Sequence, residues 1–160
     1  MEDYFVFRDY LCLVFELLQS SLYETIQETD RGLSLSKVRE YTRQILEALV
    51  TCKESNLIHC DLKPENILTA KDGLNVKLID FGSATFNGHQ VYTYIQSRYY
   101  RAPEVLMGCH KYPPSSYFGP QFNTHPIPLY DQSIDMWSLA CTAIEMFIKI
   151  PIFPGKYDYD

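Results

Sequence analysis

Residues 59–66 read HCDLKPEN, and residues 80–82 read DFG. Both segments follow short apolar runs, which predicts loops at the ends of small strands. Four of their polar side chains could together handle a metal ion and a phosphate, namely Asp61, Lys63, Asn66 and Asp80. A DFG triplet alone is more often an ordinary turn at a strand end, so the chemical interpretation depends on both segments together.

The four side chains differ in the chemistry that they can supply. We predict that Asp61 accepts a proton from a hydroxyl group and that Lys63 neutralises a phosphoryl oxygen. Asn66 and Asp80 carry hard oxygen ligands of the kind that Mg²⁺ prefers. Gly82 leaves the backbone free to turn after the aspartate. The sequence therefore predicts a site that holds a metal ion and a phosphate.

The residues before this site predict a hairpin and two helices. Aromatic and β-branched runs at residues 4–7 and 11–15 are typical of a β-hairpin. Ser21 and Glu24 form the spacing of a capping box, which begins a short helix. Apolar residues recur at helical spacing from residue 36 to about 55, and this predicts a long amphipathic helix whose buried face holds Val38, Tyr41, Ile45, Ala48 or Leu49, and Cys52.

The residues after the site predict small strands and a final helix. Asp72 and Gly73 are a natural type I′ turn pair between apolar runs at 67–68 and 76–79. Residues 131–149 predict a helix that is apolar on nearly all sides, and such a helix should run through the middle of a core. Its main apolar stripe is expected at Ile134, Trp137, Cys141, Ile144 and Ile148.

Composition limits the class of protein. The chain has 160 residues, of which 46% are hydrophobic and 21% charged, as in one globular domain. Its net charge of −6 gives no reason to expect a nucleic acid or an anionic membrane as partner. The cysteines form no C-x-x-C pair, which favours a reducing compartment, so we expect the cytoplasm or the nucleus. We recognise no signal peptide, and charges interrupt the longest apolar stretch, so we expect no membrane span.

The order of the motifs resembles that of the protein kinases. HCDLKPEN is followed by DFG and then by APE at residues 102–104, and too many specified positions agree for coincidence. The resemblance implies an α+β, kinase-like fold, ATP and magnesium as cofactors, and a protein as substrate. The family's structural positions fall on His59, Phe81, Glu104 and Asp135, the last corresponding to the aspartate that braces the catalytic loop.

Finer features are similar to the dual-specificity tyrosine-regulated kinases and their yeast-type relatives. Cys60 stands where most kinases have arginine, and Lys63 fits the serine/threonine-kinase pattern. That family phosphorylates its own Tyr-x-Tyr during maturation and then acts on serine and threonine. The resemblance implies Tyr94 as the modified residue, with Arg98 and Arg101 as partners of its phosphate.

The other residues of these segments have plainer expected roles. We expect Cys60 to be a small buried residue without thiol chemistry. Packing roles are expected for three further tyrosines of the activation segment, which are Tyr92, Tyr99 and Tyr100.

The resemblance covers part of a kinase domain. Residues 15–18 read FELL and match the segment that links the two lobes, which implies Phe15 as gatekeeper and the backbone of Glu16 and Leu18 as adenine contacts, with Lys63 also near the nucleotide. We expect residues 1–18 to form the last N-lobe strands and the hinge, and residues 19–160 to form the C-lobe through its central helix.

Several parts of a kinase are missing from the match. The chain has no G-x-G-x-x-G loop, ATP-pairing strand lysine or later C-lobe helices, so we interpret it as truncated at both ends. Residues 1–160 alone are expected to bind Mg–ATP weakly or not at all and to lack kinase activity. Residues 109–127 are an extra, proline-rich stretch, and a surface loop, a retained intron and an error in the gene model remain open.

Two functions remain open from the sequence. The first is a dual-specificity kinase that phosphorylates proteins on serine and threonine and itself on tyrosine. The alternative is an inactive fragment or pseudokinase that serves as a protein-binding module. Retention of Asp61, Asn66 and Asp80 favours the first, because pseudokinases usually lose one of them. Substrate, pathway and oligomeric state are not readable.

Overall fold

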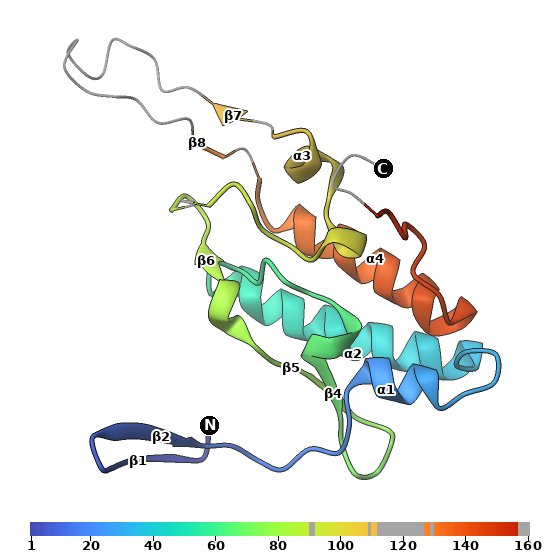
Figure 1. Ribbon diagram of the computed structural model, residues 1–160, viewed down its shortest axis with the longest axis horizontal. Coiled ribbons are helices and arrows are strands. Elements are labelled where there is room, and N and C mark those ends of the chain that lie inside the picture. The colour runs from blue at the N-terminus through green and yellow to red at the C-terminus, as the bar shows by residue number, and fades with distance from the viewer. Residues whose placement is uncertain (90–91, 109, 112–126, 129, 157–160) are drawn as a thin grey trace.

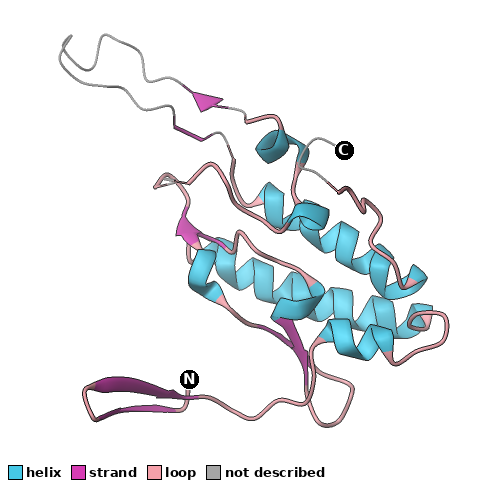
Figure 2. Ribbon diagram, in the orientation of Figure 1, coloured by secondary structure: helices cyan, strands magenta, loops and turns pink. Residues whose placement is uncertain are grey.

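Two long helices are the largest elements of the described chain, and its strands are short (Figure 1). The computed structural model describes residues 1–89, 92–108, 110–111, 127–128 and 130–156. Helices α2 (Leu35–Glu54) and α4 (Ser133–Ile148) lie side by side, and the strands pair only in twos (Figure 2). The mixture of helices and strands confirms the expected α+β class.

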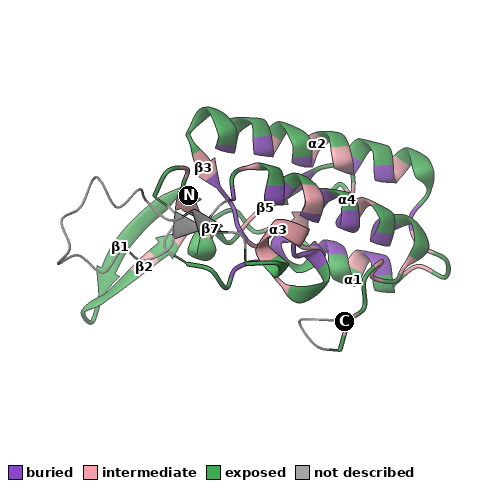
Figure 3. Ribbon diagram, turned by 90° about the horizontal axis from the view of Figure 1, so that it is seen from above, coloured by how far each residue is buried: buried purple, intermediate pink, exposed green. Residues whose placement is uncertain are grey.

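The N-terminal hairpin is formed as predicted. Strands β1 (Asp3–Phe7) and β2 (Tyr10–Val14) pair in antiparallel register, with Phe7 opposite Tyr10. The two turn residues, Arg8 and Asp9, both have positive φ angles of 47° and 64°, as a two-residue type I′ turn requires. Every residue of β1 is exposed, and the hairpin lies apart from the helices (Figures 1 and 3).

The first helix has its predicted cap, and the second has its predicted buried face. Helix α1 (Leu22–Gln27) begins with the expected capping box, in which Ser21 and Glu24 satisfy each other's backbone N–H groups. Ser34 caps α2, whose buried residues are Val38, Tyr41, Ile45, Leu49 and Cys52. Apart from Cys52, this face packs with α1 and with Leu139 and Met146 of α4 into the larger of two core clusters.

A second hairpin is present, but its predicted turn type is wrong. Strands β4 (Ile67–Thr69) and β5 (Val76–Leu78) are antiparallel. Of the turn pair, only Gly73 has a positive φ, 63°, whereas a type I′ turn needs two such residues. Asp72 instead accepts the N–H groups of Leu74 and Asn75, and this local bonding stabilises a wider loop.

Helix α4 forms at the predicted place in the chain, but the prediction that it runs through the middle of a core is wrong, because a face with Met136, Ala140 and Phe147 is exposed. Part of its expected apolar stripe is wrong for the same reason. Ile144 and Ile148 are 39% and 41% exposed. The buried face instead includes four polar residues, which are Asp135, Ser138, Thr142 and Glu145. Two of them turn inward because Asp135 accepts backbone N–H groups and Ser138 donates to a backbone carbonyl of neighbouring loops.

The remaining elements are short and carry the loops of the candidate site. Strand β3 (Leu57–Ile58) pairs with β6 (Thr85–Phe86), and β7 (His110–Lys111) pairs with β8 (Ile127–Pro128). Single turns of helix occur at η1 (Pro64–Asn66), η2 (Phe81–Ser83), η3 (Arg98–Tyr100) and α3 (Pro103–Leu106). Most of the expected insertion at 109–127 lies outside the described residues. Within the described ranges, no helix is long and apolar enough to span a bilayer.

Candidate functional site

Asp61 lies among three polar partners at the end of β3. Its Oδ2 accepts hydrogen bonds from Nζ of Lys63 at 2.8 Å and from Nδ2 of Asn66 at 3.1 Å, and its Oδ1 accepts the hydroxyl of Ser97 at 2.7 Å. Lys63 also donates to the Ser97 oxygen at 3.0 Å. The Asp61 and Lys63 side chains are only 17% and 23% exposed, so their attraction is less screened than on an open surface. The fold thus brings the predicted proton acceptor and cation together.

Asp135 on α4 holds the loop that carries Asp61. Its two carboxylate oxygens accept the backbone N–H groups of His59 at 2.8 Å and Cys60 at 3.0 Å. Asp135 is 2% exposed, and this burial raises the pKa of its carboxyl group, while the two N–H donors act in the opposite direction. The expected brace is thus present as a contact.

Cys60 is fully buried, in agreement with its expected role as a small packing residue. Burial raises the pKa of its thiol to about 12, so the group stays protonated at neutral pH. Its φ angle of 66° lies in the left-handed region, which reverses the chain between His59 and Asp61.

His59 connects this loop to the DFG segment. Its Nε2 lies 3.0 Å from the carbonyl oxygen of Ile79, and its Nδ1 accepts the N–H of Asp61 at 3.3 Å. These contacts require a proton on Nε2 and a lone pair on Nδ1. The ring also meets Phe81 edge to face, with centroids 4.8 Å apart. One buried histidine therefore positions both motifs.

Asn66 and Asp80 lie at the same end of the β4–β5 hairpin. Asn66 precedes β4, Asp80 follows β5, and Ile79 donates its N–H to the carbonyl of Asn66 at 2.9 Å. Asp80 is exposed and has a φ of 62°, and its carboxylate accepts the N–H of Gly82 at 3.2 Å. Since Mg²⁺ usually takes one or two protein oxygens together with phosphate oxygens, this pair fits a magnesium–phosphate. Among the residues described, no group of three His, Cys, Asp or Glu forms a metal cluster.

The activation-segment tyrosines differ in exposure. Tyr94 is 71% exposed, and the guanidinium of Arg101 lies 4.4 Å from its ring centroid. Arg98 donates to the carbonyl of Lys156 at 2.9 Å. The predicted packing role is confirmed for Tyr100, which is 4% exposed, and is wrong for Tyr92, whose ring is 71% exposed, and for Tyr99, at 37%.

Three further residues of this region carry contacts that the motifs did not indicate. Ser97 bonds to both Asp61 and Lys63. Glu145 accepts the hydroxyl of buried Tyr100 at 2.6 Å, and burial raises the pKa of both groups. Gln96 is 6% exposed, with both ends of its amide bonded. A signal for Glu145 was present, because the polar residues Asp135, Ser138, Thr142 and Glu145 recur at helical spacing within an apolar helix.

The expected linker of the lobes joins the hairpin to the helical body. Phe15 is 61% exposed and Leu18 is half-buried. Glu16 forms an ion pair with Lys77 of β5, with both side chains about half exposed. Near the other end of this segment, the N–H of Gln19 donates to the carbonyl of Thr69 in β4 at 2.9 Å. The linker therefore contacts the β4–β5 hairpin, which Asn66 and Asp80 flank. Its adenine contacts stay predictions.

Glu104 occupies the APE motif at the start of α3. Its Oε1 lies at 3.5 Å from the hydroxyl of Ser133, the first residue of α4. This is a weak contact at the limit of hydrogen-bond distance. It nevertheless places the APE motif next to the helix that braces the catalytic loop.

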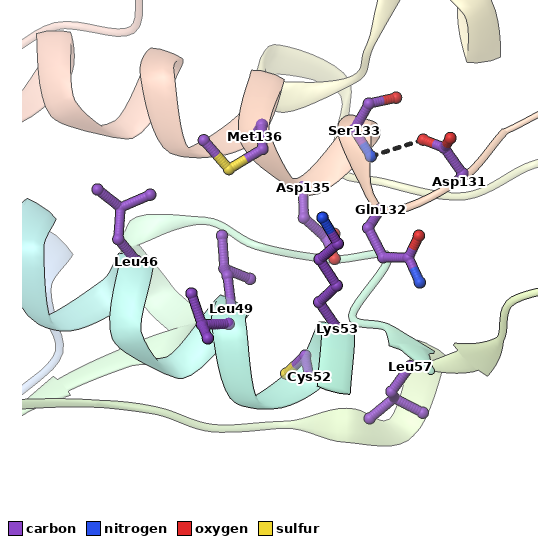
Figure 4. A pocket seen from close by; sticks show the side chains of 11 residues that line it. Leu46, Leu49, Cys52, Lys53, Leu57, Asp131, Gln132, Ser133, Asp135 and Met136 are labelled. Atoms are coloured by element: carbon purple, nitrogen blue, oxygen red, sulfur yellow. Dashed lines mark hydrogen bonds between the residues drawn. The ribbon is translucent and has the colours of Figure 1, made fainter. Parts of the chain in front are cut away.

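A groove lies between α2 and the N-terminal end of α4 (Figure 4). It encloses about 500 Å³, and its lining includes Leu46, Leu49, Met136 and Asp135. Asp135 therefore contacts both this groove and the loop that it braces. None of Asp61, Lys63, Asn66 and Asp80 lines the groove, so the candidate chemistry lies elsewhere.

Comparison with known proteins identifies the family. Residues 1–160 match the family described as protein kinase domain. The chain is similar to the dual specificity protein kinase YAK1 of Saccharomyces cerevisiae, with 50% identity over 162 residues that include 100% of this chain and 18% of that protein. It is similar to human dual specificity tyrosine-phosphorylation-regulated kinase 4, with 43% identity over 100% of this chain and 28% of that protein. The DYRK-family kinase pom1 of Schizosaccharomyces pombe is 42% identical over 99% of the chain and 13% of its own length.

These figures set the extent of the similarity. The chain spans less than a third of the length of these curated relatives. The match to the protein kinase domain and the identities with these relatives confirm the family that the motifs predicted, including its dual-specificity branch.

Proposed function

We propose, because this chain belongs to the protein kinase family, that it supplies the catalytic loop and activation segment of a dual-specificity kinase. The reaction is the transfer of the γ-phosphoryl group of Mg–ATP to serine and threonine hydroxyls of proteins, and to the chain's own Tyr94. The observation that carries the proposal is the contact of Asp61 with Lys63, on a loop that Asp135 braces.

The roles of the residues follow from their chemistry. The carboxylate of Asp61 orients the attacking hydroxyl and takes its proton as the new oxygen–phosphorus bond forms and the bond from the γ-phosphorus to the leaving ADP breaks. Lys63, 2.8 Å from that carboxylate, neutralises negative charge on the phosphoryl oxygens. Asn66 and Asp80 would hold the magnesium ion, which supplies charge neutralisation across the phosphates when bound. His59 keeps the two motifs in a fixed relation.

The test uses an assembled kinase in which residues 1–160 replace the matching segment of the Saccharomyces relative. Asp61→Asn should lower kcat by about 10³-fold while leaving the KM for ATP nearly unchanged, because the carboxylate acts on the hydroxyl and not on the nucleotide. Asp80→Asn should instead raise the KM for ATP. Equal turnover in Asp61→Asn and the parent would remove the proposed base, and an inactive parent would favour the protein-binding alternative.

Tyr94 is proposed as the self-modified residue. Its high exposure leaves the hydroxyl accessible, and Arg101 already lies against its ring, so a phosphate there would have a cation within reach. Mass spectrometry of the assembled kinase should find phosphotyrosine at Tyr94 and not in the Asp61→Asn variant. Modification of Tyr92 alone would contradict this assignment.

We also propose the cytoplasm or the nucleus as the location. The four cysteines that the structure describes are all free, which is consistent with a reducing compartment. Fractionation of cells that express the tagged protein tests this proposal.

A further inference from the structure

Gln96 has an unusual backbone for a buried residue with a Cβ atom. Its φ angle is 63°, in the left-handed region that glycine and asparagine adopt more readily, and it is 6% exposed. It lies directly before Ser97, whose hydroxyl touches both Asp61 and Lys63. The backbone conformation at Gln96 therefore determines where that hydroxyl points.

The side-chain amide of Gln96 is bonded at both ends. Its Nε2 donates to the carbonyl of Ile134 at 3.0 Å and to the hydroxyl oxygen of Ser138 at 2.8 Å, both on α4. Its Oε1 accepts the N–H of Ala102, the N-cap residue of α3, at 2.8 Å. One side chain thus links the activation segment to α4 and to the APE motif.

The main chain of Gln96 is also held. Its N–H donates to the carbonyl of Cys60 at 2.9 Å, and its own carbonyl accepts a guanidinium N–H of Arg101 at 2.9 Å. The Cys60 carbonyl belongs to the loop that Asp135 braces from α4. Because Asp135 and Ser138 are one helical turn apart, α4 supports both the catalytic loop and Gln96.

We propose that Gln96 is a positioning residue for phosphoryl transfer. Its amide maintains the left-handed backbone at position 96, and this places the Ser97 hydroxyl between Asp61 and Lys63. The ammonium group of Lys63 and the carboxylate of Asp61 are then held in the positions that the incoming hydroxyl requires. The inference rests on the proposed kinase function for its catalytic consequence, but its structural part concerns the chain itself.

The first experiment measures amide hydrogen exchange in the chain of residues 1–160. Gln96→Met keeps the length of the side chain and removes the three amide hydrogen bonds. The amide at position 96, whose bond to Cys60 does not involve the side chain, should exchange at least about tenfold faster, while the amides of α2 stay protected. Unchanged exchange at position 96 would overturn the proposal. If Gln96→Met loses protection throughout, Gln96→Glu, which keeps the length and shape of the side chain and removes the two hydrogen bonds that Nε2 donates, is measured under the same criterion.

The second experiment separates positioning from a general loss of stability. In the assembled kinase, Gln96→Met should lower kcat by about tenfold with an unchanged KM for ATP. In a Ser97→Ala background, the same substitution should lower kcat by less than about twofold, because its effect acts through that hydroxyl. Additive effects would contradict the proposed route through Ser97. An inactive parent would refute the proposed function, and the exchange measurement would still decide the structural part.

Discussion

The segment of residues 58–62 and the β1–β2 hairpin both contain apolar residues, yet these residues differ in burial. Ile58, Cys60 and Leu62 are at most 1% exposed, whereas Val6 and Leu11 are 69% and 65% exposed (Figure 3). The segment donates two backbone N–H groups to the Asp135 carboxylate of α4, while the strands of the hairpin pair only with each other. The apolar content of a segment therefore does not show how strongly that segment is stabilised. Its contacts with the helical body do. The predictions that follow test this difference, beginning with the largest effect.

The largest effect is expected at Asp135. Asp135→Ala leaves the N–H groups of His59 and Cys60 buried without their acceptor, and an orphaned buried donor costs about 1–3 kcal/mol. We expect a loss of roughly 2–6 kcal/mol in the free energy of unfolding, measured by urea denaturation. Asp131→Ala is the matched control, because this exposed aspartate accepts the N–H of Ser133 at the start of the same helix, and its loss should cost about 1 kcal/mol. Equal losses in the two variants would contradict the central role of the buried brace.

The next effect concerns an apolar side chain of the loop. Leu62 is 1% exposed and belongs to the larger core cluster. Leu62→Ala should lower the free energy of unfolding by about 2–5 kcal/mol, because the transfer energy is lost and a cavity is left. Denaturation monitored by far-UV circular dichroism checks this value. A loss below about 1 kcal/mol would mean that the loop is held by its polar contacts alone.

Sequence reasoning predicted those elements whose information is local. The capping box at Ser21 and Glu24 and the face of α2 depend on spacings within one helix, and both are present. The four residues assigned to chemistry also follow from motif order, and the fold brings Asp61, Lys63 and Asn66 into direct contact.

What the sequence did not show depends on contacts between distant segments. Gln96 and Ser97 acquire their roles from partners at Ile134 and Asp61, 38 and 36 residues away. The exposure of Ile144 likewise depends on which face of α4 receives polar groups from other loops. The type I′ turn predicted at Asp72 does not form, because the Asp72 carboxylate accepts two backbone N–H groups and this bonding competes with the tight turn.

A smaller effect with a defined pH dependence is expected at Glu145. This carboxyl group is 1% exposed, and burial, with a contribution from the charge of Glu65, raises its pKa above the ordinary 4.5. A raised carboxyl pKa in the folded state means that stability is full below the unfolded pKa and is lost as pH rises through the folded pKa. Glu145→Gln keeps an acceptor for Tyr100 without the charge, so it should stabilise the chain by about 1 kcal/mol at pH 7.

The pH dependence separates this mechanism from simple repacking. The gain in Glu145→Gln should shrink as pH falls through the raised pKa of the folded state, because the parent carboxyl group then becomes protonated as well. Thermal unfolding between pH 4.5 and 7.5 measures it. A gain that is independent of pH, or a loss of stability at pH 7, would contradict the role of the buried charge. Tyr100→Phe is the companion variant, and it should be destabilising at pH 7 because it removes the hydroxyl that donates to Glu145.

The smallest effect is expected in the hairpin, where the same substitution as at Leu62 meets no core. Leu11 is 65% exposed and lies opposite Val6 on β1, so Leu11→Ala removes little buried area and leaves no cavity. We expect a change of less than about 0.5 kcal/mol in the free energy of unfolding of residues 1–160. A cost near that of Leu62→Ala would show that the hairpin packs on the helical body in solution. Since that comparison uses one chemical change at two sites, it measures directly how far burial, and not apolar character, sets the stability of each region.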